Sequence, residues 1–215
     1  MAIRTQEELI DKIAEDHIWR VREISELKGM ISLDTTSEIR KRVLCRSGIA
    51  LIYAHWEGFV KKSGAYFLEY VSFQRHNISE LRSNFITLIL KLKIDNASQS
   101  NKYSAFNEIT EYILNNRNTR AIVPYKNIIN TESNLSTTVL KEITWCLGID
   151  YSIFSSKEKF IDRRLVGRRN HVAHGQQLMV DNSDFSEMAD EVMALMNTFR
   201  NLLENSAVTG QYKAA

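Results

Sequence analysis

"LIYAHWEGFVKKSGAYFLEYV", residues 51–71, forms the centre of the longest helix that the sequence predicts. This helix is expected to begin near Thr35, with Glu38 three residues on as in a capping box, and to run to about Val71. One stripe of apolar residues recurs along it at helical spacing: Ile49, Ile52, Trp56, Phe59, Phe67 and Tyr70. Each glycine in a helix costs about 1 kcal/mol relative to alanine. A close backbone approach by a neighbouring helix, or a kink, is therefore expected at three positions: Gly48, Gly58 and Gly64.

Further helices are predicted on both sides of this stretch. Thr5 and Glu8 fit a capping box that opens a helix over residues 5–29, and Gly29 fits its end. Ser155 and Glu158 fit a second capping box, which opens a helix running through Arg169 towards His174, and Gly175 fits its end. Apolar periodicity predicts the remaining helices at residues 79–94, 103–115, 137–147 and 184–204.

Two segments lack helical periodicity. Residues 119–136 are rich in β-branched side chains and contain the only proline, Pro124, so we expect a loop or a short extended piece. Residues 206–215 are expected to form a loose tail. The sequence therefore predicts an all-α fold, a single helical domain over residues 1–205, with a probable insertion at about 75–150.

Composition and hydropathy argue for a globular chain and against a membrane-spanning or secreted one. The 215 residues are 44% hydrophobic and 25% charged, as in an ordinary globular chain, and the formal net charge is +2. No run approaches the roughly 20 apolar residues of a membrane span, and the first residues lack the layout of a secretory signal, so a cytoplasmic protein is expected. Core positions are predicted for both cysteines and all three tryptophans: Cys45, Cys146, Trp19, Trp56 and Trp145.

Polar chemistry concentrates in "GRRNHVAHG", residues 167–175. Arg169 and His174 are five residues apart, so on a straight helix they point about 140° away from each other. Asn170 shares a face with His174, while a second, basic face carries Arg164, Arg168 and His171. Such a splayed set suits a cleft between two helices, which a two-fold homodimer would supply. His171 and His174 have the spacing of two metal ligands, but no third ligand follows from the sequence, so neither a metal nor another cofactor is expected.

This stretch resembles the R-x(4–6)-H motif of HEPN domains: Arg169 is the arginine, Asn170 the polar residue that often follows it, and His174 the histidine. Residues 51–71 resemble the long second helix of the bacterial MAE-like HEPN subgroup. The resemblance implies an HEPN-like helical bundle and a metal-independent endoribonuclease that cuts RNA at a dimer cleft. It also implies a toxin or antiviral defence setting, with a possible antitoxin or larger defence complex as partner.

The residue types suit metal-free RNA cleavage. Imidazole exchanges protons near neutral pH, so His174 is expected to act as general base or acid. Arginine presents a planar fork of donors to phosphate, so Arg169 is expected to bind the scissile phosphate. Asn170 would orient His174 or donate to phosphate. The predicted supporting residues around the RNA are His171, Arg168, Arg164, Glu57 and His55.

Less specific alternatives stay open at this stage. Glu57 would orient Arg169 or form an ordinary salt bridge. Lys61 and Lys62 are expected to be surface charges rather than RNA contacts. Three arginines would follow an RNA backbone or form a solvated basic face: Arg163, Arg164 and Arg168. Three functions stay open for the whole domain. It would act as a nuclease, as a catalytically silent module that binds nucleotide, RNA or a partner, or only as a dimerising subunit of a larger complex.

Overall fold

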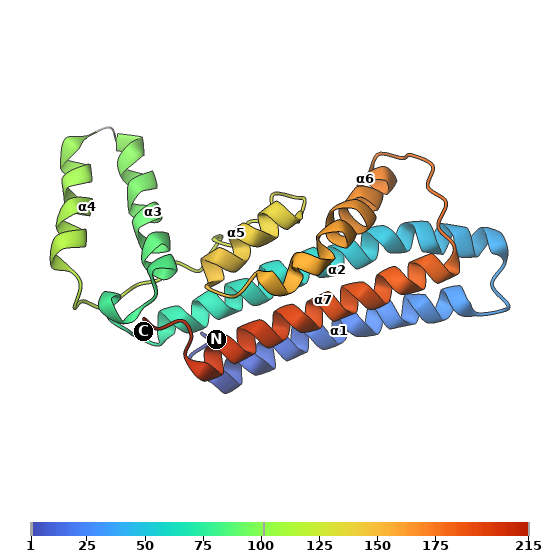
Figure 1. Cartoon of the computed structure of the whole chain (residues 1–215), viewed down its shortest axis with the longest axis horizontal. Helices are drawn as coiled ribbons and strands as arrows, with labels where there is room; N and C mark the ends of the chain where they lie inside the picture. The colour runs from blue at the N-terminus through green and yellow to red at the C-terminus, as the bar shows by residue number, and fades with distance from the viewer. Residues whose placement is uncertain (1, 101, 215) are drawn as a thin grey trace.

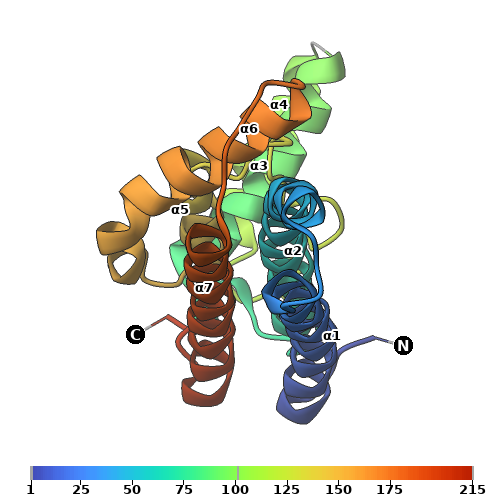
Figure 2. The same ribbon diagram turned by 90° about the vertical axis from the view of Figure 1, so that its right-hand side faces the viewer.

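The computed structural model describes residues 2–100 and 102–214. Three long helices form the main bundle: α1 (Gln6–Ser32), α2 (Glu38–Phe73) and α7 (Asn182–Thr209), which pack along one another (Figure 1). Figure 2 shows the three helices nearly end-on, as a compact triangle. At 36 residues, α2 is about 54 Å long. The all-α fold is confirmed, since the described residues form helices and no strand, with only two isolated β-bridges between loop residues.

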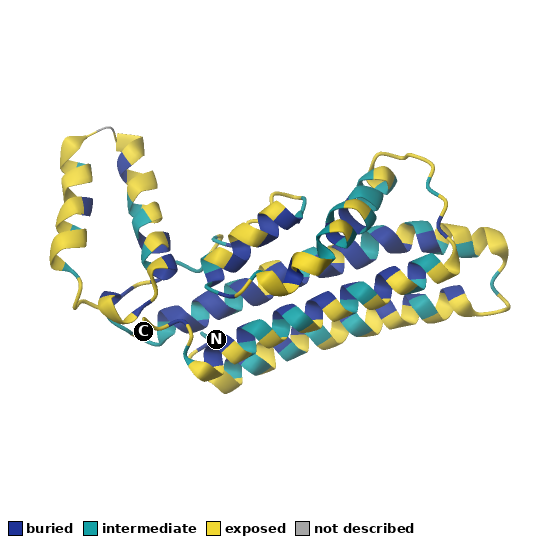
Figure 3. Ribbon diagram, viewed as in Figure 1, coloured by how far each residue is buried: buried dark blue, intermediate teal, exposed yellow. Residues whose placement is uncertain are grey.

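A second layer lies against α2. It consists of α5 (Thr137–Leu147), a 3₁₀ turn (Ser152–Lys157), a π-helical run (Phe160–Gly167) and α6 (Arg168–Ala173). An outlying hairpin of α3 (Ser83–Ser100) and α4 (Tyr103–Asn115) follows the 3₁₀ turn Ile78–Glu80 at the far end of α2 (Figure 1). Most of the burial is in the bundle and the second layer, while the hairpin is largely exposed (Figure 3). No helix in the described part of the chain is both long and apolar enough to cross a membrane.

Several local predictions are confirmed. The capping box at Thr5 and Glu8 is present, and both glycine-free helices of the hairpin lie close to their predicted ranges. Gly175, at φ 70°, ends α6 by donating its N–H to Val172. Residues 119–136 form an irregular connection in which four apolar side chains are buried: Ala121, Val123, Ile129 and Leu135.

Other local predictions are wrong. Ser155 and Glu158 form no capping box, because the chain there is a 3₁₀ turn and Glu158 instead accepts from Tyr151 and pairs with Lys141. The N-cap of α2 is Ser37, two residues later than expected. Trp56 is fully buried, but Trp19 and Trp145 are about half exposed, and Cys146 is only partly buried while Cys45 is buried.

The tail prediction is also wrong as far as Ala214; Ala215 lies outside the described residues. Helix α7 continues to Thr209, and Tyr212 is buried against Tyr70, with 5.8 Å between the ring centroids. The N–H of Ala214 then donates to the carbonyl of Glu80 at 2.9 Å. The small and polar residues of the tail are therefore held by tertiary contacts that leave no periodic signal.

The glycines of α2 mark close approaches by side chains, and the helix is not broken there. A Cβ at Gly48 would lie 2.6 Å from the Phe185 ring and 2.9 Å from Leu27. At Gly58 it would lie 2.9 Å from the guanidinium of Arg20. These positions let α1 and α7 sit closer to α2 than an alanine would allow.

Replacing Gly48 with alanine should therefore destabilise the bundle. The expected overpacking of about 1–3 kcal/mol exceeds the gain of about 1 kcal/mol in helix propensity. The matched control is Gly29→Ala, in the last turn of α1, where a Cβ meets nothing within 4 Å. Urea unfolding should show a lower midpoint for Gly48→Ala and an equal or higher one for Gly29→Ala. Equal midpoints for wild type and Gly48→Ala would contradict the close packing.

Candidate functional site

Arg169 is the centre of the candidate site. Its guanidinium carbon lies 4.1 Å from the centroid of the Tyr53 ring on α2. One terminal nitrogen donates to the carbonyl of Ser133 at 2.5 Å, and the other donates to Oδ1 of Asn170 at 2.9 Å. Its Nε is buried without a hydrogen-bond partner among the described residues. Stacking and two neutral acceptors thus fix the side chain without cancelling its charge.

Tyr53 links the arginine to the irregular segment at residues 119–136. It is only 3% exposed, and its hydroxyl accepts the backbone N–H of Leu135 at 2.6 Å. Burial raises the pKa of Tyr53, so the hydroxyl remains neutral at physiological pH. Glu132 and Ser133, just before this bond, have φ values of 52° and 58°, a region that non-glycine residues seldom occupy. The segment is therefore bent sharply at the point where its carbonyl meets Arg169.

His174 lies at the C-terminal end of α6. Its backbone N–H donates to Asn170, and its side chain is exposed, with no hydrogen bond or ion pair among the described residues. Asn170 uses Oδ1 to hold Arg169, so the structure assigns this side chain to the arginine rather than to the histidine. His171 is exposed too, with Nδ1 2.7 Å from the carbonyl of Gly167.

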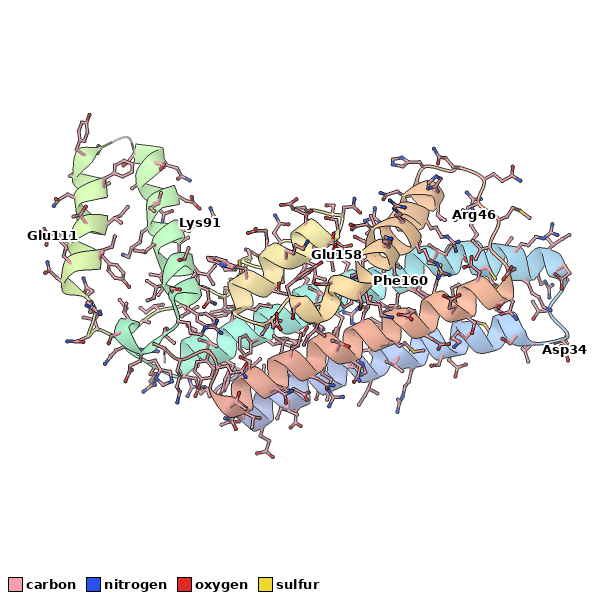
Figure 4. The ribbon with its side chains drawn as sticks, in the orientation of Figure 1. Asp34, Arg46, Lys91, Glu111, Glu158 and Phe160 are labelled. Carbon is pink, nitrogen blue, oxygen red and sulfur yellow. The ribbon has the colours of Figure 1, made fainter. Side chains whose placement is uncertain are left out.

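The loop after α6 is tied down by a residue that the sequence did not single out. Arg46 of α2 donates to the carbonyl of Gln176 at 2.9 Å, two residues beyond His174. Figure 4 labels Arg46 near the end of α6. Its contact fixes the path of the chain that carries His174.

Acidic side chains of α7 neutralise the two arginines of the predicted basic face. Arg164 donates to Asp184 at 2.7 Å and to Glu187 at 2.6 Å, and Arg168 also pairs with Asp184. Burial alone would raise the pKa of Asp184, but hydrogen bonds from Arg168 and Arg164 outweigh it and lower that pKa. These two arginines therefore anchor the π-helical run and the start of α6 to α7.

His55 faces away from Arg169. It is 3% exposed, its Nε2 lies 3.0 Å from Glu23 on α1, and its ring packs edge-on against Trp19. Burial lowers its pKa despite that carboxylate. Glu57 is half-buried one turn from Tyr53, yet none of the ion pairs in the described chain joins it to Arg169. His55, expected to support the RNA, is therefore packed against α1 in this structure, and Glu57, expected to orient the arginine or form a salt bridge, makes no ion pair with Arg169 among the described residues.

The sequence did not identify Tyr53, Ser133 or Leu135. Tyr53 was visible in the quoted helix as an aromatic one turn before Glu57, but nothing linked it to Arg169. Of the two lysines, Lys62 pairs with the buried Asp16 of α1 at 2.8 Å, so it has a structural role. No group of three or more potential metal ligands is found among the described residues.

One comparison with known proteins gives a match. A family model described as MAE_28990-like HEPN matches residues 9–212. No curated protein gives a significant match, and no solved structure does either. The match runs through both the bundle and the segment at 75–150.

The pairing of Arg164 and Arg168 with Asp184 gives a pH-dependent prediction. The folded-state pKa of Asp184 is lowered. Its ionised carboxylate therefore adds to the free energy of unfolding at pH values above the ordinary aspartate pKa of about 3.9, and this stabilisation is lost as the pH falls below that value. Asp184→Asn should lower the free energy of unfolding by about 1–2 kcal/mol at pH 7, and by less as the pH falls below 4.

The control is Asp190→Asn on the same helix, whose exposed carboxylate pairs with Lys28. Its effect should be within about 0.5 kcal/mol at every pH. Urea unfolding at several pH values makes the comparison. If the loss of unfolding free energy in Asp184→Asn stayed constant from pH 7 to pH 3, it would argue against an ionised carboxylate at this position.

Proposed function

Since the chain belongs to the MAE_28990-like HEPN family, we propose that it is an endoribonuclease that cleaves RNA without a metal, in a cleft between two copies. Arg169, Asn170 and His174 occupy the R-x(4–6)-H motif of that family. The observation that carries the proposal is the state of Arg169. It is held by Tyr53 and Asn170, with no carboxylate partner among the described residues, and His174, five residues on at the C-cap of α6, is exposed.

Charge distinguishes Arg169 from its neighbours. The positive charges of Arg164 and Arg168 are compensated by Asp184 and Glu187, while the acceptors of Arg169 are an amide oxygen and a backbone carbonyl. A guanidinium without a carboxylate retains its attraction for phosphate oxygens and binds them in a planar fork. Arg169 would therefore bind the scissile phosphate and stabilise the charge that develops on it.

His174 supplies the proton chemistry. In one copy, a neutral imidazole would take the proton of the ribose 2′-OH as that oxygen attacks phosphorus. In the other copy, a protonated imidazole would give its proton to the departing 5′-oxygen. The new bond joins the 2′-oxygen to phosphorus and the bond to the 5′-oxygen breaks, leaving a 2′,3′-cyclic phosphate and a 5′-hydroxyl. Because His174 is exposed at the tip of α6, a second copy can approach it.

The supporting roles follow from the contacts. Asn170 holds Arg169, and His171 extends the polar surface beside His174. Arg164 and Arg168 position α6 against α7. A role as a toxin or in antiviral defence, with an antitoxin or a larger complex as partner, belongs to the same proposal and rests on the family alone. The cytoplasm is the proposed place of action.

A catalytically silent RNA-binding module is the second candidate. It is favoured by the 2.5 Å bond from Arg169 to the Ser133 carbonyl, which occupies one donor that phosphate would use. In that case RNA would be retained but never shortened. The two functions differ in the products and share the same binding surface.

The main test is cleavage of end-labelled single-stranded RNA in the presence of EDTA. His174→Ala should slow cleavage by about 10²–10⁴-fold, since it removes the proton donor and acceptor. Arg169→Ala should also abolish most of the activity. The matched control is Arg22→Ala, an exposed arginine of α1 with no ion pair among those found in the described chain, which should cleave like wild type. DNA of the same sequence should stay intact. Equal cleavage by all three variants would remove the assignment.

Tyr53 gives a separate prediction about how Arg169 is held. Tyr53→Phe keeps the ring under the guanidinium, whereas Tyr53→Leu removes it. Because a desolvated cation–π contact contributes about 2 kcal/mol, the leucine variant should cleave up to about 30-fold more slowly than the phenylalanine variant. The rates are compared on the same RNA after circular dichroism has confirmed that both variants are folded. Identical rates would show that the ring does not position the arginine.

A further inference from the structure

Arg46 of α2 has an environment like that of Arg169. Each side chain is half-buried, donates from a terminal nitrogen to a backbone carbonyl, and has no carboxylate partner among the described residues. In both, Nε is buried without a hydrogen-bond partner in the described part of the chain. Removing a positive charge partly from water is costly when no carboxylate compensates it, so both guanidinium groups gain by meeting an anion.

The two arginines lie along the same side of α2, together with a third. Arg42, Arg46 and Tyr53 follow one another at intervals of four and seven residues, so their directions on the helix agree to within about 40°. Arg169 lies on the ring of Tyr53, and Arg46 lies near the end of α6 (Figure 4). Three guanidinium groups therefore form a row along α2, and we call Arg42, Arg46 and Arg169 the arginine row.

The carboxylates nearest to Arg42 are engaged elsewhere. Arg42 is exposed at a pocket of about 350 Å³ that Glu38 and Asp181 also line. Glu38 pairs with Lys41 at 3.4 Å, and Oδ1 of Asp181 accepts the N–H of Asp184 at the start of α7. Arg42 itself has no ion pair among those found in the described chain, so its charge remains available at the surface.

The middle of the row is joined to the chain that carries His174. The last turn of α6 closes with a bond from the N–H of Gln176 to the carbonyl of His171, at 2.9 Å. Arg46 donates to the carbonyl of the same Gln176, also at 2.9 Å. The contact of Arg46 is therefore made two residues beyond the proposed proton-transfer group.

We propose that the arginine row binds successive phosphates of one RNA strand, which runs along α2 from Arg169 past Arg46 to Arg42. The inference rests on the proposed function, because it extends the RNA away from the scissile phosphate. Four residues of helix rise by about 6 Å, comparable with the spacing of neighbouring phosphates in an extended strand. The rise from Arg42 to Tyr53 is about 16 Å, so the row accommodates roughly four nucleotides.

The surroundings of the row favour this direction. Glu57 lies one turn beyond Tyr53, half-buried and without an ion pair among those found in the described chain, so its carboxylate repels a strand that continues past Arg169. Between Arg46 and Tyr53 the helix carries Ala50, whose small side chain leaves room for a backbone to approach. Guanidinium groups in a single line fit one phosphate backbone and read no base sequence.

The test measures binding of a fluorescent 2′-O-methyl RNA of about 12 nucleotides, which cannot be cleaved because its attacking hydroxyl is blocked. For single strands, the logarithm of the association constant falls with the logarithm of salt concentration, with a slope of about −0.7 per phosphate contacted. Arg42→Ala and Arg46→Gln should each raise Kd about tenfold at low salt and make the slope shallower by about 0.7. Glutamine at position 46 keeps a donor for the carbonyl of Gln176.

The matched control is Arg40→Ala on the same helix. Arg40 is exposed, has no ion pair among those found in the described chain, and points about 200° away from Arg42 around the helix. Its loss removes the same charge, yet it should leave the salt slope unchanged and alter Kd by less than about twofold. Fluorescence anisotropy gives the binding curves, and circular dichroism should show equal helix content for all variants.

The outcomes separate the row from the nuclease. An unchanged Kd and slope in both Arg42→Ala and Arg46→Gln, an equal loss in Arg40→Ala, or no binding by wild type would overturn the proposal. A poly-glutamate peptide that binds as tightly as RNA, and loses affinity in the same variants, would assign the row to an acidic protein instead. If the row variants lose binding while wild type never cuts RNA, the row stands and the nuclease proposal fails. If His174→Ala abolishes cleavage while the row variants keep both KM and Kd, the nuclease stands and the row fails.

Discussion

The position of α2 between two layers determines where every site residue points. Successive residues on a helix are 100° apart, so Tyr53 and His55, two positions apart, face nearly opposite directions. Tyr53 lies under Arg169 in the upper layer, while His55 lies against Trp19 and Glu23 of α1. The ring of Phe185 fits against α2 only because Gly48 has no side chain. The packing of the bundle therefore fixes the rotation of α2, and that rotation places an aromatic ring beneath the arginine.

The acidic start of α7 determines which arginine remains available. Arg164 and Arg168 are four residues apart and reach the same carboxylate, Asp184, because both face α7. Arg169, one position further along, is rotated away from that helix and meets Tyr53 and Ser133 instead. Three arginines that look alike in the sequence thus have two different environments: two of them pair with Asp184, and the third has no carboxylate partner among the described residues.

How much the sequence predicts depends on the range of the interaction. Helices with local signals, such as the capping box at Thr5 and the glycine at position 175, were predicted close to their observed bounds. Arg169 and His174 were found because their motif spans six residues. Tyr53 and Ser133 were missed, since they lie 116 and 36 residues from Arg169 and reach it only through folding. The burial of Tyr212 was missed for the same reason, because its partner, Tyr70, lies 142 residues away in the sequence.

The segment at residues 119–136 connects the hairpin to the site, and its anchoring decides whether the two influence each other. Next to the hairpin, Ala121 donates its N–H to the carbonyl of His76. Four side chains of the segment are buried before Ser133 reaches Arg169: Ala121, Val123, Ile129 and Thr131. A displacement of the hairpin would have to disturb each of these packed positions in turn, and packed interiors resist such changes. Contacts made by the hairpin would therefore leave the geometry around Arg169 unchanged, although a single stretch of chain joins the two.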